Sequence, residues 1–219
     1  MRGIPIAREG LPLIGLSLGF SILLFVLGVP VLPFIIFLFF LFFLFFFRNP
    51  KRVPLHDDGS FISPADGKII DISDINEGEF IHGRARRICI FMSPLDVHVN
   101  RAPCEGKILK VQHRKGEFAL AFKKDIDKEN ERNYILIDHG GEKVLLVQVA
   151  GFLARRIISY VKEGDFVKKG DPVGMIAFGS RVDIYFPEEY ESMVKLDMKV
   201  KAGVTSLAKA RLRFMKNNG

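Results

Sequence analysis

Two patterns of hydrophobic residues divide this chain of 219 residues. From Gly10 to Phe47 there is no charged residue, and most positions are Phe, Leu, Ile or Val. An apolar run of more than about 18 residues is long enough to span a membrane, and this run is too long for a signal-peptide core. Beyond it, short β-branched runs alternate with polar residues and are broken by glycine. The second pattern predicts antiparallel strands.

The apolar run predicts two helices. It is about twice the length that one crossing needs, and the stretch GVPVLP, from Gly28 to Pro33, interrupts its middle. Because proline removes a backbone donor and clashes with the preceding turn, we expect a helical hairpin at about 11–29 and 31–48. Basic residues flank both ends of the run. Since such residues favour the cytoplasmic side, both ends and the main domain are expected there. One long kinked span with the main domain outside is the alternative.

The whole chain is expected to have three parts: a membrane anchor at 1–48, a polar, proline-bearing linker at 49–59, and a mainly β domain at 60–219. Residues 67–80, 106–118 and 156–171 form a weak internal repeat, in which a strand pattern and a polar stretch lead to Gly-acid-Phe. Stacked units of this kind predict a compact barrel or sandwich. Helix patterns in this domain are few, at 188–196 and 206–216.

The stretch VKEGDFVKKGDPVGMI, residues 161–176, is similar to the hammerhead pattern of biotinyl and lipoyl carrier domains. Those carriers hold their cofactor on an exposed lysine at a hairpin tip. Here the following hairpin carries Gly-Ser instead. The similarity therefore implies a related β architecture without the carrier chemistry.

Charge and cysteine content narrow the class of partner. The net charge of +7 suits the anionic headgroups of a membrane surface. No basic motif with interleaved aromatic residues supports nucleic-acid binding. Cys89 and Cys104 have neither metal-ligand spacing nor a disulfide framework. We expect both to pack as small hydrophobic residues in a reducing compartment.

Three short motifs carry candidate chemistry. SPADG (63–67) contains Asp66, SPLDVHVNRAPCEG (93–106) contains His98, and FGSRVD (178–183) contains Ser180. Each has an ordinary structural explanation when taken alone. Asp-Gly and Gly-Ser are common turn pairs, and a histidine in an alternating strand is at least as often structural as catalytic.

Together the three motifs resemble the phosphatidylserine decarboxylase family. The resemblance covers most of residues 60 to 190, and the apolar N-terminal segment fits it as well. The Gly-Ser-Arg form and the short C-terminal piece are similar to the compact subgroup of that family. Longer members often carry a second histidine three places after the first, where this chain has Arg101. His98 is therefore the only histidine that the motif offers.

The resemblance implies that the chain cuts itself. Ser180 would attack the carbonyl of Gly179, and the amide would become an ester. Elimination would then separate residues 1–179, the β chain, from residues 180–219, the α chain, and would leave a pyruvoyl group at position 180. Serine is a weak nucleophile that needs a nearby base, and an imidazole oriented by a carboxylate meets that need. His98 fits as the base and Asp66 as its orienter.

The same resemblance implies the reaction of the mature enzyme. The amine of a serine phospholipid would form a Schiff base with the pyruvoyl group, and carbon dioxide would leave. His98 would then protonate the carbanion as a general acid, and an ethanolamine lipid would be released. No metal and no external cofactor is expected. Arg101 and Arg181 are candidate contacts for the lipid phosphate or the substrate carboxylate, and the alternative for both is solvated surface arginine.

Two further hypotheses remain open from the sequence. The same chemistry on an ether-linked archaeal serine lipid would use the same residues. A membrane-tethered adaptor with a lipoyl-like barrel would need no Asp-His-Ser set, and its chain would stay intact. The sequence also leaves open whether the chain forms a homo-oligomer.

Overall fold

A computed structural model describes residues 5–54, 59–116, 130–151, 157–176 and 180–211. The chain divides into two compact units, Met1–Lys51 and Arg52–Gly219. The first is helical and the second is built from strands, as the two hydrophobic patterns predict.

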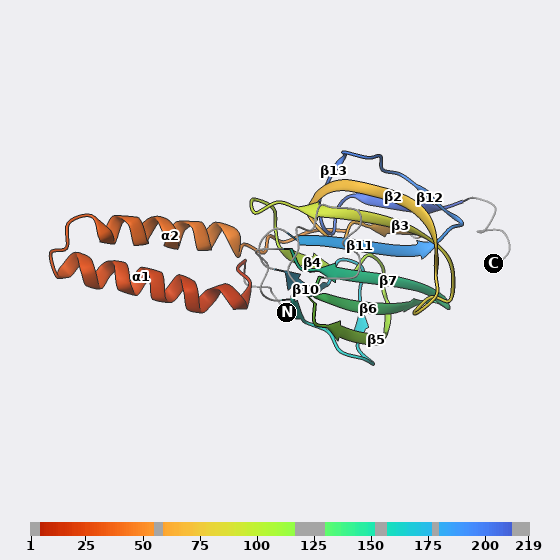
Figure 1. The fold of residues 1–219 in the computed structure, drawn as a ribbon, viewed down its shortest axis with the longest axis horizontal. Coiled ribbons are helices and arrows are strands. Elements are labelled where there is room, and N and C mark those ends of the chain that lie inside the picture. Colours follow the sequence, from red (N-terminus) through yellow and green to blue (C-terminus); the bar gives the residue numbers. More distant parts are fainter. Residues whose placement is uncertain (1–4, 55–58, 117–129, 152–156, 177–179, 212–219) are drawn as a thin grey trace. The chain divides into compact units, whose positions relative to one another are not determined.

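The N-terminal unit is a helical hairpin. A short 3-10 helix, Arg8–Gly10, leads into α1, Leu11–Val26, and a turn through Gly28 leads into α2, Leu32–Phe46 (Figure 1). Both predicted helices are present and slightly shorter than expected. Pro33 lies in the first turn of α2, where its missing N–H costs nothing. The hydroxyl of Ser21 donates to the carbonyl oxygen of Pro33 at 2.8 Å and joins the two helices.

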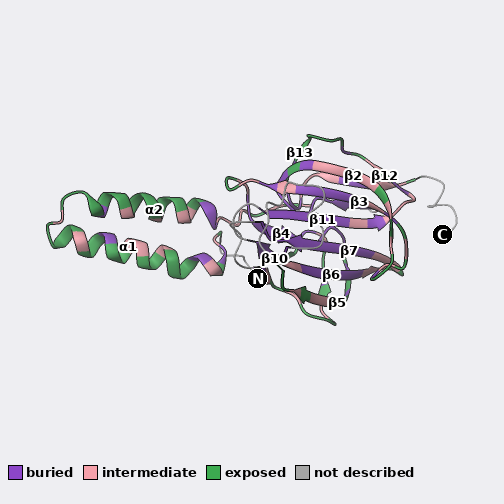
Figure 2. Cartoon of the chain, viewed as in Figure 1, coloured by how far each residue is buried: buried purple, intermediate pink, exposed green. Residues whose placement is uncertain are grey.

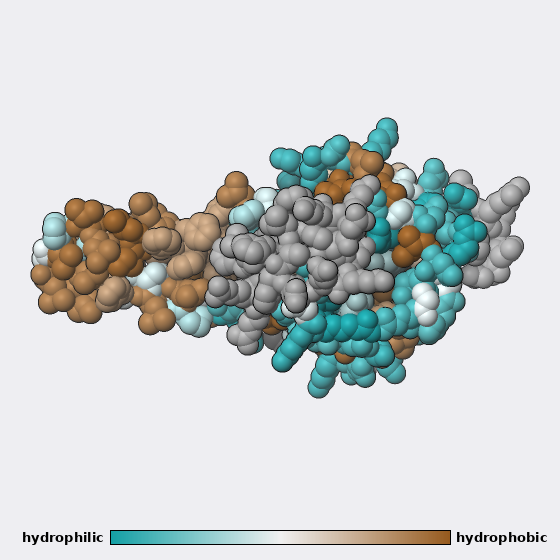
Figure 3. Space-filling model, in the orientation of Figure 1, coloured by the Kyte–Doolittle hydropathy of each residue, from teal (hydrophilic) through white to brown (hydrophobic). Residues whose placement is uncertain are grey.

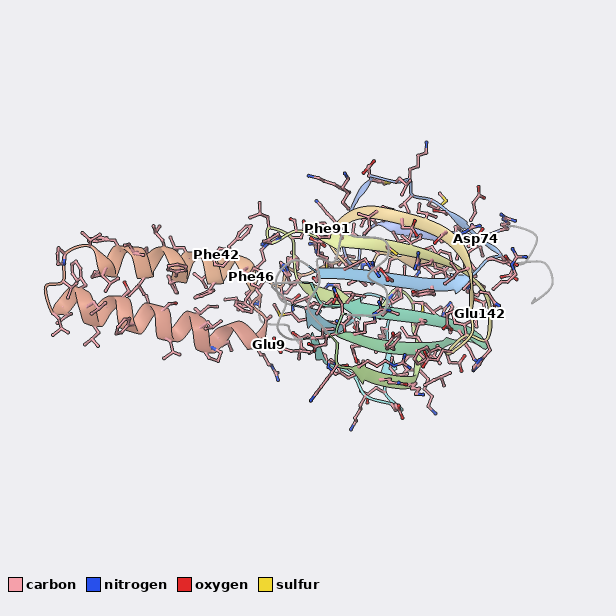
Figure 4. The ribbon with its side chains drawn as sticks, viewed as in Figure 1. Glu9, Phe42, Phe46, Asp74, Phe91 and Glu142 are labelled. Carbon is pink, nitrogen blue, oxygen red and sulfur yellow. The ribbon has the colours of Figure 1, made fainter. Side chains whose placement is uncertain are left out.

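The face of this hairpin shown in Figure 3 is largely apolar along its length. Phenylalanine rings follow one another along α2, where the centroids of Phe42 and Phe46 lie 5.8 Å apart (Figure 4). The helical stretch Arg8–Val26 has 19 residues and a mean hydropathy of 1.9, enough by length and composition to cross a membrane. The second helix, with 15 residues, is shorter. The unit therefore fits membrane association.

The second unit is dominated by one antiparallel sheet of eight strands in the order β13-β2-β3-β11-β7-β6-β5-β9 (Figure 1). Its strands are β2 Gly67–Glu77, β3 Gly83–Met92, β5 Gly106–Arg114, β6 Arg132–His139, β7 Glu142–Val149, β9 Phe166–Val167, β11 Ser180–Pro187 and β13 Lys199–Val200.

Two three-stranded sheets accompany the large one, in the orders β1-β14-β12 and β4-β10-β8. Their strands are β1 Ser60–Ile62, β14 Ser206–Ala210, β12 Tyr190–Ser192, β4 Val99–Arg101, β10 Pro172–Ile176 and β8 Ile157–Ser159. Side chains of all three sheets meet in one core: Ile184 and Phe186 from β11 pack in the same cluster as Phe61 from β1 and Val173 from β10. Figure 2 shows the buried residues concentrated along the central strands. This is a mainly β domain with a curled principal sheet.

The internal repeat is visible in the sheet. β2 and β5 begin at Gly67 and Gly106, and a Cβ at either position would lie 2.2 Å from a carbonyl oxygen of the neighbouring strand. Each strand shifts register after its third residue. Each also pairs near its start with a two-residue edge strand, β13 on β2 and β9 on β5. Two of the three predicted copies therefore occupy corresponding places, and the third, 156–171, supplies β8 and β9 instead.

The two helices predicted within the β domain are wrong. Residues 188–196 contain β12, and 206–216 begins with β14. β14 pairs with both β1 and β12, and its Leu207 and Ala208 are fully buried. Pairing on both edges satisfies the backbone of this segment, which outweighs the helical spacing of its apolar residues. Residues 212–216 lie outside the described part of the chain.

Candidate active site

Ser180 is the first residue of the central strand β11. The strand pairs with β3 on one side and β7 on the other, and Ser180 lies opposite Met92 at the end of β3. Phe91, the residue before Met92, marks that end of β3 in Figure 4. The Ser180 side chain is fully buried. Gly179, the other half of the predicted cleavage site, lies outside the described residues.

The Ser180 hydroxyl is oriented by sulfur. Its Oγ donates to Sδ of Met92 at 3.6 Å, and Nδ2 of Asn100 donates to the same sulfur at 3.6 Å. A thioether is a weak acceptor and does not act as a base near neutral pH. Met92 therefore directs the hydroxyl without removing its proton.

His98 directly precedes β4 and is fully buried. β4 pairs with β10, the strand that leads toward residues 177–179. At the end of this pairing the N–H of Ile176 donates to the carbonyl oxygen of His98 at 3.3 Å. The backbone of His98 is thus held against the strand that ends just before the Gly-Ser pair.

Asp66 lies in the connection between β1 and β2 and is 8% exposed. Its Oδ2 accepts a hydrogen bond from Arg52 at 2.8 Å, and its Oδ1 accepts the N–H of Ala202 at 2.7 Å. The same connection is tied to β4, because the N–H of Arg101 donates to the carbonyl oxygen of Pro64 at 2.9 Å. Asp66 and His98 therefore lie in segments attached to opposite ends of β4.

Arg101 closes β4 and is 7% exposed. Its Nη1 donates to the carbonyl oxygen of Gly170 at 2.9 Å. Burial, and next the charge of Arg52, lowers the pKa of the Arg101 guanidinium, while Asp66 and Asp171 oppose that shift. The buried Arg101 and the partly buried Arg52 thus share the neighbourhood of the Asp66 carboxylate.

Arg181 lies on the opposite face of β11 from Ser180, because successive side chains of a strand alternate. It forms an ion pair with Asp183, in which Nε–Oδ1 is 2.8 Å and Nη2–Oδ2 is 2.9 Å. Cys89 of β3 lies opposite Asp183 of β11 in the ladder between the two strands. Burial, and next the charge of Asp183, raises the pKa of the Cys89 thiol. Cys89 and Cys104 are buried free thiols, as predicted from their spacing.

The sequence reasoning missed several buried polar residues around Ser180 and β11, although a signal for them was present. Gln148 interrupts the apolar run VLLVQVAG, and Asp183 interrupts RVDIYF. A polar residue in such a run costs free energy when buried, unless it is hydrogen-bonded. Such interruptions mark positions with a specific partner. In the part of the chain that the structure describes, no group of three or more His, Cys, Asp or Glu could hold a metal ion.

Comparison with known proteins identifies the family. The family model described as phosphatidylserine decarboxylase matches residues 39–208. A phosphatidylserine decarboxylase proenzyme of Carboxydothermus hydrogenoformans is 47% identical over 166 residues, which cover 75% of this chain and 78% of the relative. Proteins of the same name from Desulfotalea psychrophila and Syntrophus aciditrophicus are 41% and 39% identical over 205 residues. Those two alignments cover 93% and 92% of this chain and 96% of each relative. The three motifs and the β domain that carries them thus agree with a match over most of the chain, which belongs to the phosphatidylserine decarboxylase family.

Proposed function

We propose that this chain is the precursor of a pyruvoyl-dependent enzyme that decarboxylates phosphatidylserine to phosphatidylethanolamine in phospholipid biosynthesis. Membership of the family supports the reaction. The single observation in the fold that carries the proposal is the buried Ser180 at the start of the central strand, with its hydroxyl held by a non-basic acceptor. A surface turn residue would need neither the burial nor the partner.

The proposed first step is an acyl shift. Oγ of Ser180 bonds to the carbonyl carbon of Gly179, the C–N bond breaks, and the hydroxyl proton passes through a base to the released nitrogen. We assign that base to His98, because its backbone is held beside the strand that precedes the junction. Asp66 is its proposed orienter. A carboxylate has about four lone-pair sites, so the two hydrogen bonds from Arg52 and Ala202 leave capacity for an imidazole.

The second step breaks the chain. A base removes the Cα proton of residue 180, the bond between its Cβ and Oγ breaks, and Gly179 leaves as a carboxylate that keeps this oxygen. Water then attacks the dehydroalanine, its nitrogen leaves as ammonia, and a pyruvoyl group remains. The buried position of Ser180 fits a small group made in place, because nothing has to enter from solution except water. When formed, the group supplies an electrophilic ketone that accepts the electron pair left by departing carbon dioxide.

The remaining residues act on the substrate. His98 would hold the proton that the carbon receives after carbon dioxide has left. Arg101 is the proposed contact for the lipid phosphate or the carboxylate, since a planar guanidinium suits bidentate binding of either anion. Arg181 is the second candidate, and its pairing with Asp183 would have to open first.

We further propose an arrangement along the chain. Residues 1–48 would anchor the enzyme in the cell membrane. Residues 49–59 would link this anchor to the decarboxylase domain, which residues 60–219 would form on the cytoplasmic face. Self-cleavage would give chains 1–179 and 180–219. The apolar hairpin and the basic residues at its ends support this topology.

Intact-protein mass spectrometry of the purified chain tests the proposal. Two pieces are expected, one ending at Gly179 and one beginning at position 180 with a pyruvoyl group, lighter than serine by the loss of ammonia. Ser180→Ala should remain a single chain without decarboxylase activity. A wild-type chain that stays uncut after long incubation, or an active uncut Ser180→Ala variant, would refute the mechanism.

Two assays separate the remaining alternatives. Diacyl and ether-linked serine lipids, presented to the detergent-solubilised enzyme, distinguish the two lipid substrates by the carbon dioxide released from each. The adaptor hypothesis predicts an uncut chain and no carbon dioxide from either lipid. Release from the diacyl lipid is the expected result.

A further inference from the structure

A chain of buried side chains leads to Ser180, and the processing chemistry described above does not use it. Asn133 on β6 donates from Nδ2 to Oε1 of Gln148 on β7 at 2.9 Å. Gln148 donates from Nε2 to Oδ1 of Asn100 on β4 at 2.8 Å. Asn100 donates to Sδ of Met92, the atom that also accepts the Ser180 hydroxyl. We call Asn133, Gln148, Asn100 and Met92 the amide relay.

The burial of the amide relay implies a strong reason for its presence. None of its four residues is more than 2% exposed. A buried amide without hydrogen bonds costs about 1–3 kcal/mol, and an apolar residue at any of these strand positions would avoid that risk. The partners also fix the direction of the relay. Because Oε1 of Gln148 accepts from Asn133, its Nε2 faces Asn100, and the amide nitrogen of Asn100 is left for the sulfur.

The amide relay connects the large sheet to β4, the strand that directly follows His98. Gln148 belongs to the eight-stranded sheet, while Asn100 belongs to β4, two residues after His98. Gly174 of β10 pairs with Asn100 and makes room for the contact, because a Cβ there would lie 2.7 Å from Nε2 of Gln148. The position of β4 relative to Ser180 is therefore set by side-chain hydrogen bonds as well as by apolar packing.

We infer that the amide relay positions Ser180 for its attack on Gly179. This inference rests on the proposed self-cleavage. With its hydrogen directed at Met92, the hydroxyl has one defined rotamer, and its oxygen lone pairs point away from the sulfur. Because a thioether is a weak acceptor, this hydrogen bond orients the hydroxyl and is easily exchanged for one to a base. Asn100 fixes the sulfur, and Gln148 fixes Asn100; all are positioning residues.

The sharpest test replaces Met92 in two ways. Met92→Leu keeps an apolar side chain of similar size but removes the acceptor. Met92→Gln restores an acceptor at the same reach but places an amide in an apolar core. If packing alone matters, Met92→Leu should be the better variant in both stability and cleavage rate. If the amide relay positions Ser180, Met92→Gln should cleave faster than Met92→Leu. Met175→Leu is the matched control, because Met175 is also a buried methionine, 2% exposed on β10.

The measured quantity is the rate of self-cleavage of the full-length precursor, followed by gel electrophoresis after synthesis in the presence of detergent. Met92→Leu should cleave about 10- to 100-fold more slowly, since a misplacement of about 1 Å can cost about 100-fold in rate. Met92→Gln should cleave faster than Met92→Leu while melting at a lower temperature in a Ser180→Ala background. Met175→Leu should cleave like the wild type. Met92→Gln would then cleave faster than Met92→Leu although it is less stable, and packing alone does not produce that combination.

Gln148, in the middle of the amide relay, provides a second test. Gln148→Met has a similar length and no hydrogen bonds, and it should also slow cleavage by about 10-fold or more. Wild-type rates in Met92→Leu or in Gln148→Met would overturn the inference. So would equal slowing in Met92→Leu and Met175→Leu with Met92→Gln slower still. A wild-type chain that never cleaves would refute the proposed function instead, so the two failures are distinguishable.

Discussion

The ion pair between Arg181 and Asp183 allows a quantitative prediction about the strand that carries Ser180. The two side chains are 5% and 2% exposed, and they meet through two N–O contacts of 2.8 and 2.9 Å. Removing one partner of such a pair leaves a buried charge without compensation, which costs about 3–5 kcal/mol. Replacing both partners by apolar residues of similar size removes the charge and its desolvation cost together.

We therefore expect a strongly non-additive double-mutant cycle. Arg181→Met and Asp183→Leu should each lower the free energy of unfolding by about 3–5 kcal/mol, and the double variant should lie within about 1 kcal/mol of the parent. The assay is urea unfolding of the full chain in detergent, followed by far-UV circular dichroism. A Ser180→Ala background keeps the chain in one piece. Single variants that cost less than about 1 kcal/mol, or a double variant that costs the sum, would refute this reasoning.

The same double variant, made in the cleaving chain, decides the second role considered for Arg181. If Arg181 only holds β11, the stable double variant should bind substrate as the wild type does. A raised KM at unchanged stability would instead assign Arg181 to the lipid headgroup. The measurement is the KM for phosphatidylserine in mixed micelles.

Two further predictions concern stability. Burial raises the pKa of the Cys104 thiol and of the Tyr190 phenol, which also donates to Glu142 at 2.6 Å. The folded chain keeps these protons where the unfolded chain loses them, above the ordinary pKa values of 9.0 and 10.0. Stability should therefore fall as the pH rises above 9.0, and an equal melting temperature at about pH 8 and about pH 10.5 would contradict this. Gly174→Ala should cost about 1–3 kcal/mol, because its Cβ would lie 2.6 Å from the carbonyl oxygen of Ile158; Gly83→Ala, with no atom within 4 Å, is the control.

The parts of the fold that the sequence predicts are those in which local pattern and tertiary packing agree. The uncharged run required helices, and the proline-containing interruption located the turn between them. Alternation with glycine breaks predicted strands, and the two Gly-Lys-Ile openings marked corresponding places in the sheet. The helix patterns at 188–196 and 206–216 failed because pairing with β1, a partner distant in sequence, decides the state of β14. A local pattern carries no information about such a partner.

The candidate site shows the same division between local and distant information. Short motifs marked Asp66, His98 and Ser180 because each motif is contiguous in the sequence. The amide relay is assembled from β6, β7, β4 and β3, so no contiguous motif exists for it. The Arg181–Asp183 pair, in contrast, was accessible from the sequence. Residues two apart on one strand share a face, and opposite charges there within an apolar run indicate a buried pair.

Strand pairing explains why the proposed cleavage would not release the smaller chain. The cut falls just before Ser180, the first residue of β11, so only the nitrogen of residue 180 is lost and the pairing from Arg181 to Pro187 is left intact. β11 is hydrogen-bonded on both edges, to β3 and to β7, and β13 and β14 pair with β2 and β1. Each of those partner strands comes from before position 180. The product of self-cleavage would therefore be two chains interleaved in one sheet and one core, and the new N-terminal group would stay where Ser180 had been.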